Sequence, residues 1–187
     1  MNEPELRNFM YTAQIRDHSP FAIRYPRGKG VTPDWQQPMT EIPIGKGRKL
    51  REGTDLAILS FGHPGNFAEE AIQELEGQNV SIAHYDMRFA KPLDEALLHE
   101  IFRNHDQVLT VEDGAVNGGF GSAVLEFMAE HNYQANTKRL GIPDEIVEHG
   151  DPAVQQQYCG VDKAGILNAI NTMVGVKPQA TNQVLSS

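Results

Sequence analysis

The chain has 187 residues, of which 40% are hydrophobic, and its 16 Lys and Arg against 25 Asp and Glu give a formal net charge of −9. This length suits one domain, or one domain and part of another, and the composition excludes a disordered chain. The lack of an apolar run of about 18 residues argues against a membrane span, the start lacks a signal-peptide core, and the acidic total argues against general nucleic-acid binding.

Charge is divided unevenly along the chain. Residues 1–51 hold nine Lys and Arg and five Asp and Glu, a net charge of +4, whereas the remaining residues have a net charge of −13. Such a split predicts two parts with different roles. The single cysteine, Cys159, excludes an internal disulfide and indicates a reducing compartment, for which we expect the cytoplasm.

The first 30 residues predict one helix and one strand. The helix is expected over 4–16, because Pro4 suits a first turn and apolar residues follow at helical spacing. Residues 21–25 (FAIRY) predict a strand that Pro26 stops, since proline cannot donate to a sheet. A lone helix and strand cannot bury their apolar faces unaided, so residues 1–30 are interpreted as the truncated end of a separate domain.

Residues 31–45 are expected to be a linker. Three prolines stiffen this segment, and Trp35 and Met39 are candidates for docking it onto a neighbour. Residues 177–187 (KPQATNQVLSS) lack apolar periodicity and predict a mobile tail.

Residues 46–176 alternate between apolar runs of strand length and amphipathic helical stretches. This alternation predicts an α/β domain with an open, mostly parallel sheet in three layers, helices covering both faces. Strands are expected at 47–51, 55–61, 80–85, 107–111 and 137–141, and helices at 64–76, 93–102, 119–131, 152–158 and 162–174.

The segment Arg24-Tyr25-Pro26-Arg27-Gly28 is the densest chemical signal. Two arginines flank the end of a predicted strand, where ligands sit in open α/β sheets. The planar guanidinium suits bidentate contact with phosphate or carboxylate. The alternative is that both arginines pair with acids of the protein surface.

Two further strand ends carry polar residues. Asp86 and Arg88 could face a substrate, but an internal ion pair that fixes the loop is the favoured interpretation. Glu112 precedes the glycine-rich segment 118–121, which lacks the spacing of GxGxxG and the Lys-Ser/Thr of a phosphate-binding loop. We therefore expect the glycines to permit tight helix packing and Glu112 to cap the helix.

The seven histidines form no metal-binding spacing. His63 and His149 lie in loops bounded by Gly or Pro and could approach a ligand, although a solvated or capping role is favoured. Cys159 has no neighbour that marks it as a nucleophile. GxSxG is absent, and so is a GDG segment followed by a distal Asn.

Five ordered segments resemble the carboxyl end of the 1-deoxy-D-xylulose-5-phosphate synthase family. Transketolases and the β subunits of 2-oxo-acid dehydrogenases share the domain but not this series of motifs, and the resemblance extends to about residue 174. The segments are AIRYPRGKG (22–30), IPIGKGRKLREGTDLAILSFG (42–62), DMRFAKPLDEALL (86–98), VEDGAVNGGFGSAVLEF (111–127) and LGIPDEIVEHG (140–150).

The resemblance implies a transferase that condenses pyruvate with glyceraldehyde 3-phosphate, with loss of carbon dioxide. This is the first step of the non-mevalonate isoprenoid pathway, and its product also enters thiamine biosynthesis. The family uses thiamine diphosphate and Mg²⁺, and its members are homodimers. Residues 1–30 would then be the end of the pyrimidine-binding domain, and 46–176 the transketolase C-terminal-type domain.

The family's metal-binding GDG region, its amino-terminal histidines and the glutamate that activates the cofactor have no counterpart here. We therefore expect no catalytic, cofactor-binding or metal-binding residue in this chain, no bound cofactor and no activity of the chain alone. The resemblance implies that Arg27 binds the phosphate of the aldehyde. Arg24 belongs to the same motif and is a weaker candidate.

Two other interpretations stay open from the sequence. One is a separate C-terminal subunit of a split transketolase-like enzyme, although its start would cut through the pyrimidine domain. The other is a non-catalytic module that binds a partner through its acidic face, which the charge split motivates.

Overall fold

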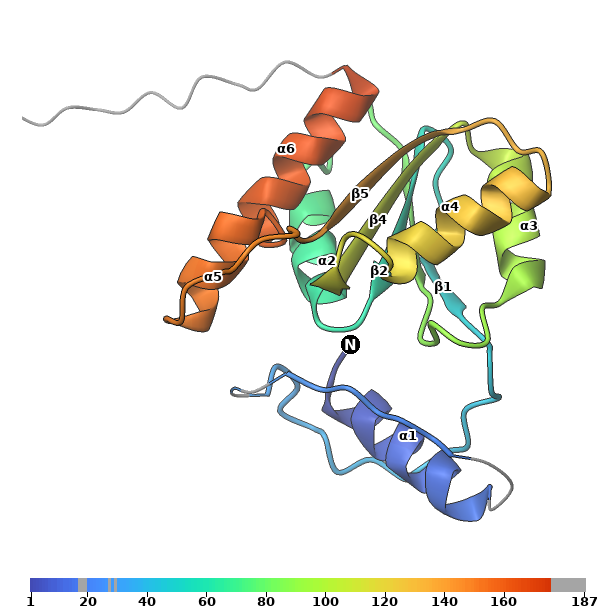
Figure 1. Cartoon of the computed structure of the whole chain (residues 1–187), viewed down its shortest axis with the longest axis vertical. Coiled ribbons are helices and arrows are strands. Elements are labelled where there is room, and N and C mark those ends of the chain that lie inside the picture. The colour runs from blue at the N-terminus through green and yellow to red at the C-terminus, as the bar shows by residue number, and fades with distance from the viewer. Residues whose placement is uncertain (17–19, 27, 29, 176–187) are drawn as a thin grey trace, which may run out of the picture.

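The computed structural model describes residues 1–16, 20–26, 28 and 30–175. Within these residues, one five-stranded sheet has the order β1-β3-β2-β4-β5 and is surrounded by helices (Figure 1). The strands are β1 (Arg48–Arg51), β2 (Leu56–Phe61), β3 (Ile82–Asp86), β4 (Gln107–Ala115) and β5 (Asn136–Ile142). The helices are α1 (Glu3–Ile15), α2 (Pro64–Glu74), α3 (Glu95–Asn104), α4 (Phe120–Glu130), α5 (Pro152–Cys159) and α6 (Lys163–Val174).

The sheet is mostly parallel. Strand β2 lies parallel to both β3 and β4, and β4 lies parallel to β5. Only the edge strand β1 runs antiparallel to its neighbour β3. The predicted open, mostly parallel α/β sheet is therefore confirmed, and the strand expected at 47–51 forms one of its edges.

Two apolar cores lie on opposite faces of the sheet, and the alternation along β2 shows why. Leu56 and Ile58 face one core, where α2 and α6 pack, whereas Ala57 and Leu59 face the other, where α3 and α4 pack. Both faces of each central strand are thus buried, as expected for parallel strands with continuous apolar runs. The predicted three layers are confirmed.

The local sequence explains where four of the helices begin and where two of them end. The first-turn backbone N–H groups of four helices donate to the side chains of the preceding residue, which are Asn2, Asp94, Asp151 and Asp162. These contacts satisfy donors that a helix start leaves without partners. Helices α5 and α6 end at Gly160 (φ 67°) and Gly175 (φ 72°), in the left-handed conformation that favours glycine.

One predicted strand is wrong. The described residues 20–26 form no strand, although the run FAIRY has strand composition. A strand needs a neighbouring strand for its backbone, and none of the described residues supplies one there. Instead, the ring of Phe21 packs against Phe9 of α1 and Phe89, at centroid distances of 6.4 and 6.2 Å.

A second difference concerns β4, which was expected to end at Val111. It continues to Ala115 and still pairs with β5 after an irregularity between Val111 and Ala115. The residues Glu112 to Gly114 therefore belong to the strand end rather than to a turn.

The described residues of 31–45 contain no helix or strand. Arg7 of α1 holds this segment, since its Nη1 donates to the carbonyl oxygens of Trp35 and Gln37 and its guanidinium lies 5.3 Å from the Trp35 ring centroid. The expected tail, 177–187, lies outside the described residues. No helix in the described ranges is both long and apolar enough to cross a bilayer.

Candidate functional site

The carboxyl ends of β2, β3 and β4 face the amino-terminal segment of the chain. In Figure 1 the marked N-terminus and α1 lie beyond the ends of these central strands. Ligands of open α/β proteins bind at this edge of the sheet. The contacts between the segment and the strand ends therefore define the candidate site.

A buried network of charges joins α1 to the sheet at this edge. Glu5 is 5% exposed, and both its oxygens accept hydrogen bonds of 2.8 Å from Nε and Nη2 of Arg88. Arg48 of β1 bridges this pair to β3, since its Nη1 lies 3.2 Å from Glu5 Oε1 and its Nη2 lies 3.0 Å from Asp86 Oδ2.

Asp86 and Arg88 each form an internal ion pair, as expected, but their partners are other residues. Asp86, at 1% exposure, pairs with Arg48, while Arg88 pairs with Glu5, 83 residues away in sequence. Arg88 also has a left-handed backbone conformation (φ 56°), which is uncommon for a residue with a side chain. The end of β3 and the loop after it are therefore fixed by partners from two other elements, β1 and α1.

Glu112 acts as the cap of α4. It is buried at the end of β4, and its two oxygens each accept a 2.8 Å hydrogen bond, from the backbone N–H groups of Phe120 and Gly121. A carboxylate at this position satisfies two free donors and favours the positive end of the helix dipole. The capping interpretation is confirmed.

The glycines at the start of α4 permit close packing, as expected. A Cβ on Gly119 would lie 2.1 Å from the carbonyl oxygen of Ala115, and one on Gly121 would lie 2.5 Å from Thr110 Oγ1. Any larger side chain would push α4 away from β4. The glycine-rich segment therefore serves the helix–sheet contact.

Of the two candidate arginines, only Arg24 lies among the described residues. Arg24 lies at the carboxyl edge of the sheet, where its Nη2 donates a 2.8 Å hydrogen bond to the carbonyl oxygen of Asp113 in β4. This contact brings the segment containing Arg24 against the predicted strand end. Arg27 lies outside the described residues, so its role stays a prediction.

One series of hydrogen-bonded side chains was not predicted from the sequence. His84 is fully buried on β3, with its Nε2 2.8 Å from Ser60 Oγ and its Nδ1 hydrogen-bonded to Glu69 of α2. The hydrogen bond with His84 lowers the pKa of the Glu69 carboxyl. Ser60 is fully buried, so no substrate reaches its hydroxyl. These hydrogen-bonded side chains instead connect α2 to the sheet. A histidine inside an apolar strand was their only sequence signal.

Neither the two loop histidines nor Cys159 lies in surroundings that would activate its side chain for catalysis. His63 packs edge-on against Phe67, with its Nδ1 3.3 Å from Asn66 Nδ2, and burial lowers the pKa of its imidazole. His149 is exposed. Burial raises the pKa of the Cys159 thiol, which disfavours the reactive thiolate.

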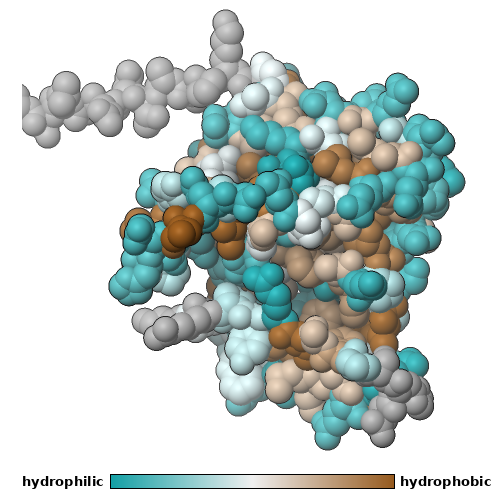
Figure 2. Space-filling view, in the orientation of Figure 1, coloured by the Kyte–Doolittle hydropathy of each residue, from teal (hydrophilic) through white to brown (hydrophobic). Residues whose placement is uncertain are grey.

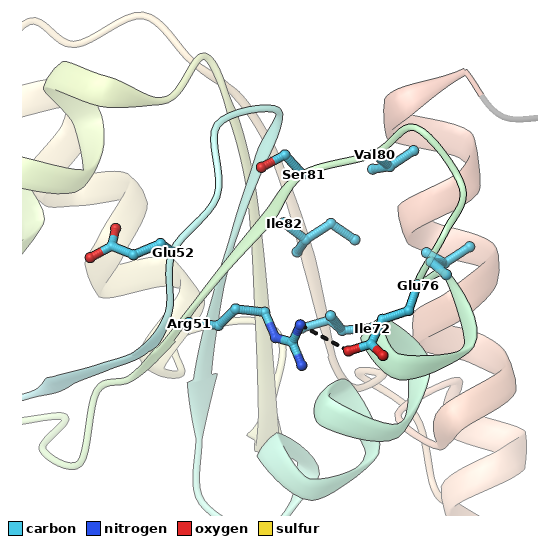
Figure 3. A pocket seen from close by; sticks show the side chains of 8 residues that line it. Arg51, Glu52, Ile72, Glu76, Val80, Ser81 and Ile82 are labelled. Carbon is cyan, nitrogen blue, oxygen red and sulfur yellow. Dashed lines mark hydrogen bonds and ion pairs between the residues drawn. The ribbon is translucent and has the colours of Figure 1, made fainter.

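A pocket of about 240 Å³ lies at the opposite edge of the sheet (Figure 3). Arg51 and Glu76 form an ion pair of 3.1 Å beside it, and Ser81 and Ile82 at the start of β3 also line it. The pocket therefore sits at the amino end of β3, away from the candidate site. It contains none of the residues predicted to bind a ligand.

No three His, Cys, Asp or Glu side chains among the described residues converge to form a metal site. The carboxylates of Glu5, Asp86 and Glu112 at the candidate site already pair with guanidinium or backbone N–H groups. The donor set of this part of the chain therefore does not fit Mg²⁺, which needs oxygen ligands around an octahedron.

The family described as "Transketolase, C-terminal domain" matches residues 45–166. The 1-deoxy-D-xylulose-5-phosphate synthase of Cytophaga hutchinsonii is 55% identical over 177 residues, which are 94% of this chain and 28% of that protein. The synthase of Bacteroides thetaiotaomicron is 57% identical over 164 residues, 87% of this chain and 25% of that protein. The chain thus spans about a quarter of these relatives and is homologous to their carboxyl-terminal part.

Solved structures agree on the fold. A chain described as "Split gene transketolase, inactive beta4 tetramer" superposes with a TM-score of 0.67 at 29% identity, over 74% of this chain and 45% of that one. The transketolase of Campylobacter jejuni superposes with a TM-score of 0.52 at 17% identity, over 68% of this chain and 18% of that one. The second likeness supports the fold alone.

Proposed function

Because the chain belongs to the transketolase C-terminal domain family, we propose that it is the carboxyl-terminal part of a 1-deoxy-D-xylulose-5-phosphate synthase. The whole enzyme would condense pyruvate with glyceraldehyde 3-phosphate and release carbon dioxide. The observation that carries this proposal is the identity of 52–57% with five such synthases over most of this chain. A homodimer in the cytoplasm is part of the same proposal.

Thiamine diphosphate and Mg²⁺ would supply the carbon–carbon chemistry of the whole enzyme. The described residues offer no cluster of ligands for the metal ion, so we assign the binding of Mg²⁺, and of the cofactor with it, to other parts of the enzyme. This chain contributes a supporting α/β domain and the residue Arg27, which binds the phosphate of the aldehyde. Arg24 is the weaker phosphate candidate, because its guanidinium already donates to the Asp113 carbonyl.

The exposed surface of the amino-terminal segment supports a larger protein. Several large apolar side chains of this segment are exposed, and apolar surface appears around it in the lower part of Figure 2. Exposed apolar side chains gathered on one segment support contact with other protein. The side chains are Met10, Ile15, Tyr25, Val31, Trp35, Met39 and Ile44.

The substitution Arg27→Ala in the full-length synthase is expected to raise the KM for glyceraldehyde 3-phosphate about tenfold to a hundredfold. The reason is that a charge-assisted contact with phosphate contributes about 1.5–3 kcal/mol. The KM for pyruvate should change little, since pyruvate has no phosphate. Steady-state kinetics with each substrate varied in turn measure both constants.

Arg16→Ala is the matched control, because Arg16 makes an exposed ion pair with Glu41 on the same segment. Its two KM values should equal those of the wild type. An aldehyde KM that Arg27→Ala leaves unchanged would refute the assignment of Arg27.

A separate C-terminal subunit is the second candidate, favoured by the likeness to a split gene transketolase. The DNA upstream of Met1 distinguishes the two. An in-frame continuation that encodes the rest of a pyrimidine-binding domain supports the single-chain synthase, and an in-frame stop codon supports the subunit.

A further inference from the structure

Helix α5 and the loop before it expose apolar side chains. Ile146 in the loop 143–151 is 91% exposed, and Val154 and Tyr158 of α5 are each 63% exposed. Because Val154 and Tyr158 are four residues apart, they lie on one face of the helix. The hydroxyl of Tyr158 donates a 2.7 Å hydrogen bond to Glu145 Oε1, which holds the neighbour of Ile146 against this face. We call Ile146, Val154 and Tyr158 the α5 patch.

The helix that carries this patch has little support from the described residues. None of its eight residues is buried in the part of the chain that the structure describes, whereas α6 buries Ile166, Ala169 and Ile170. In Figure 2, hydrophobic surface lies among hydrophilic surface at the left, where Figure 1 shows α5. A helix this short is marginal in water, and most helical stability in proteins comes from packing an apolar face. The exposed face of α5 is therefore suited to contact with another body.

The charge around the patch indicates what kind of body fits it. Residues 140–162 contain no Lys or Arg and five acidic residues, which are Asp144, Glu145, Glu148, Asp151 and Asp162. The three nearest to Ile146 in sequence are exposed. A second α5 patch placed against the first would bring like charges together, which is unfavourable. The charge instead favours a surface that is apolar at its centre and has Lys or Arg at its rim.

The loop that carries Ile146 lies at the same edge of the sheet as the amino-terminal segment. It begins directly after β5, which is parallel to β4, so it leaves the sheet at the carboxyl ends of the strands. Arg24 of the amino-terminal segment donates to Asp113 of β4 at this edge. The chain spans only 28% of the Cytophaga hutchinsonii synthase, so most of the proposed enzyme lies outside it. That remainder is large enough to contact both the amino-terminal segment and the α5 patch.

Building on the proposed function, we propose that the α5 patch is a docking surface for the preceding, cofactor-binding part of the same synthase. The surface that meets it is apolar and basic. The C-terminal domain is then attached to that part at two places, through the amino-terminal segment and through α5. Two attachments fix the orientation of the domain, which a single linker does not.

Hydrogen exchange of the α5 amides measures whether the patch is covered. In this chain by itself these amides should exchange fast, because the helix buries none of its residues against the described part of the chain. In the full-length synthase they should exchange at least about tenfold more slowly, because a covered helix opens less often. The amides of α6, which packs in one of the apolar cores, should exchange at similar rates in both proteins and serve as the internal control.

Ile146→Lys tests the chemistry of the contact, because it places a positive charge in the patch and should repel a basic partner. In the full-length synthase it should return α5 exchange to within about threefold of the rate in the chain alone. Glu148→Lys, which reverses a charge beside the patch, should also speed exchange. Gln134→Lys is the matched control for Ile146→Lys, since Gln134 is exposed, gains the same charge and lies just before β5, at the opposite edge of the sheet. It should leave α5 exchange unchanged.

Three results would overturn the inference. The first is equal α5 exchange in the chain and in the full-length synthase. The second is slow exchange that appears in the chain alone as its concentration rises, since a second copy would then cover the patch. The third is slow exchange in the full-length synthase that Ile146→Lys leaves as unchanged as Gln134→Lys does.

The proposed function has a separate readout, which is formation of deoxyxylulose phosphate by the same full-length protein. An active synthase with fast α5 exchange would refute the docking surface alone. A folded full-length protein that forms no product would refute the proposed function, and with it the inference that depends on it.

Discussion

Replacing Glu5 with alanine should lower the free energy of unfolding of the chain by about 3 kcal/mol, the lower end of the range for breaking a buried ion pair. The substitution leaves two guanidinium groups without their shared carboxylate. Arg88 is 15% exposed and keeps no other acid in the network, whereas Arg48 is a third exposed and keeps Asp86. The partial exposure of Arg48 is the reason for choosing the lower end. Urea unfolding followed by circular dichroism measures the difference.

Glu41→Ala is the control for this experiment, since Glu41 also joins α1 to the following segment, but through an exposed pair with Arg16. Its expected cost is about 0.5 kcal/mol, as for most surface ion pairs. Equal costs for the two variants would contradict the account of the buried network. Glu5→Ala should also make α1 more accessible to proteases, because Glu5 joins this helix to the loop after β3.

Replacing Glu112 with alanine should also cost about 3 kcal/mol. Two backbone N–H groups at the buried start of α4 would lose their acceptors, at about 1–3 kcal/mol each, and the favourable charge at the helix end would be lost. The side chain is 2% exposed, so water cannot easily replace it. The test compares the free energy of unfolding of Glu112→Ala with that of the wild type.

Glu112→Gln is the matched variant, because it keeps the size of the side chain and one acceptor oxygen. We expect it to cost less than Glu112→Ala. A cost below about 1 kcal/mol for the alanine variant would mean that the capping contact contributes no more than an average hydrogen bond.

The sheet could be predicted because its information is local. Apolar runs of strand length, such as DLAILSF, and helices with one apolar face are visible in any short window of the sequence. The same holds for Glu112, which precedes its glycine-rich helix by only eight residues. Element ends were less certain, as the extension of β4 to Ala115 shows.

The candidate site depends on contacts that no short window contains. Glu5 and Arg88 are separated by 83 residues, and Arg24 and Asp113 by 89. Which acid meets which arginine follows from the packing of α1 against the strand ends, which composition does not determine. The same limit explains why the run FAIRY was predicted as a strand, because strand formation depends on a partner elsewhere in the protein.

The most direct test of the account is an assay of the purified chain with pyruvate, glyceraldehyde 3-phosphate, thiamine diphosphate and Mg²⁺. The central claim is that this chain supplies a folded support and a phosphate contact, while the cofactor chemistry belongs to other parts of the enzyme. A cooperative unfolding transition first establishes that the chain is folded, and a full-length synthase serves as the active control. The account predicts no deoxyxylulose phosphate from the chain alone, and product formed above the enzyme-free blank would contradict it.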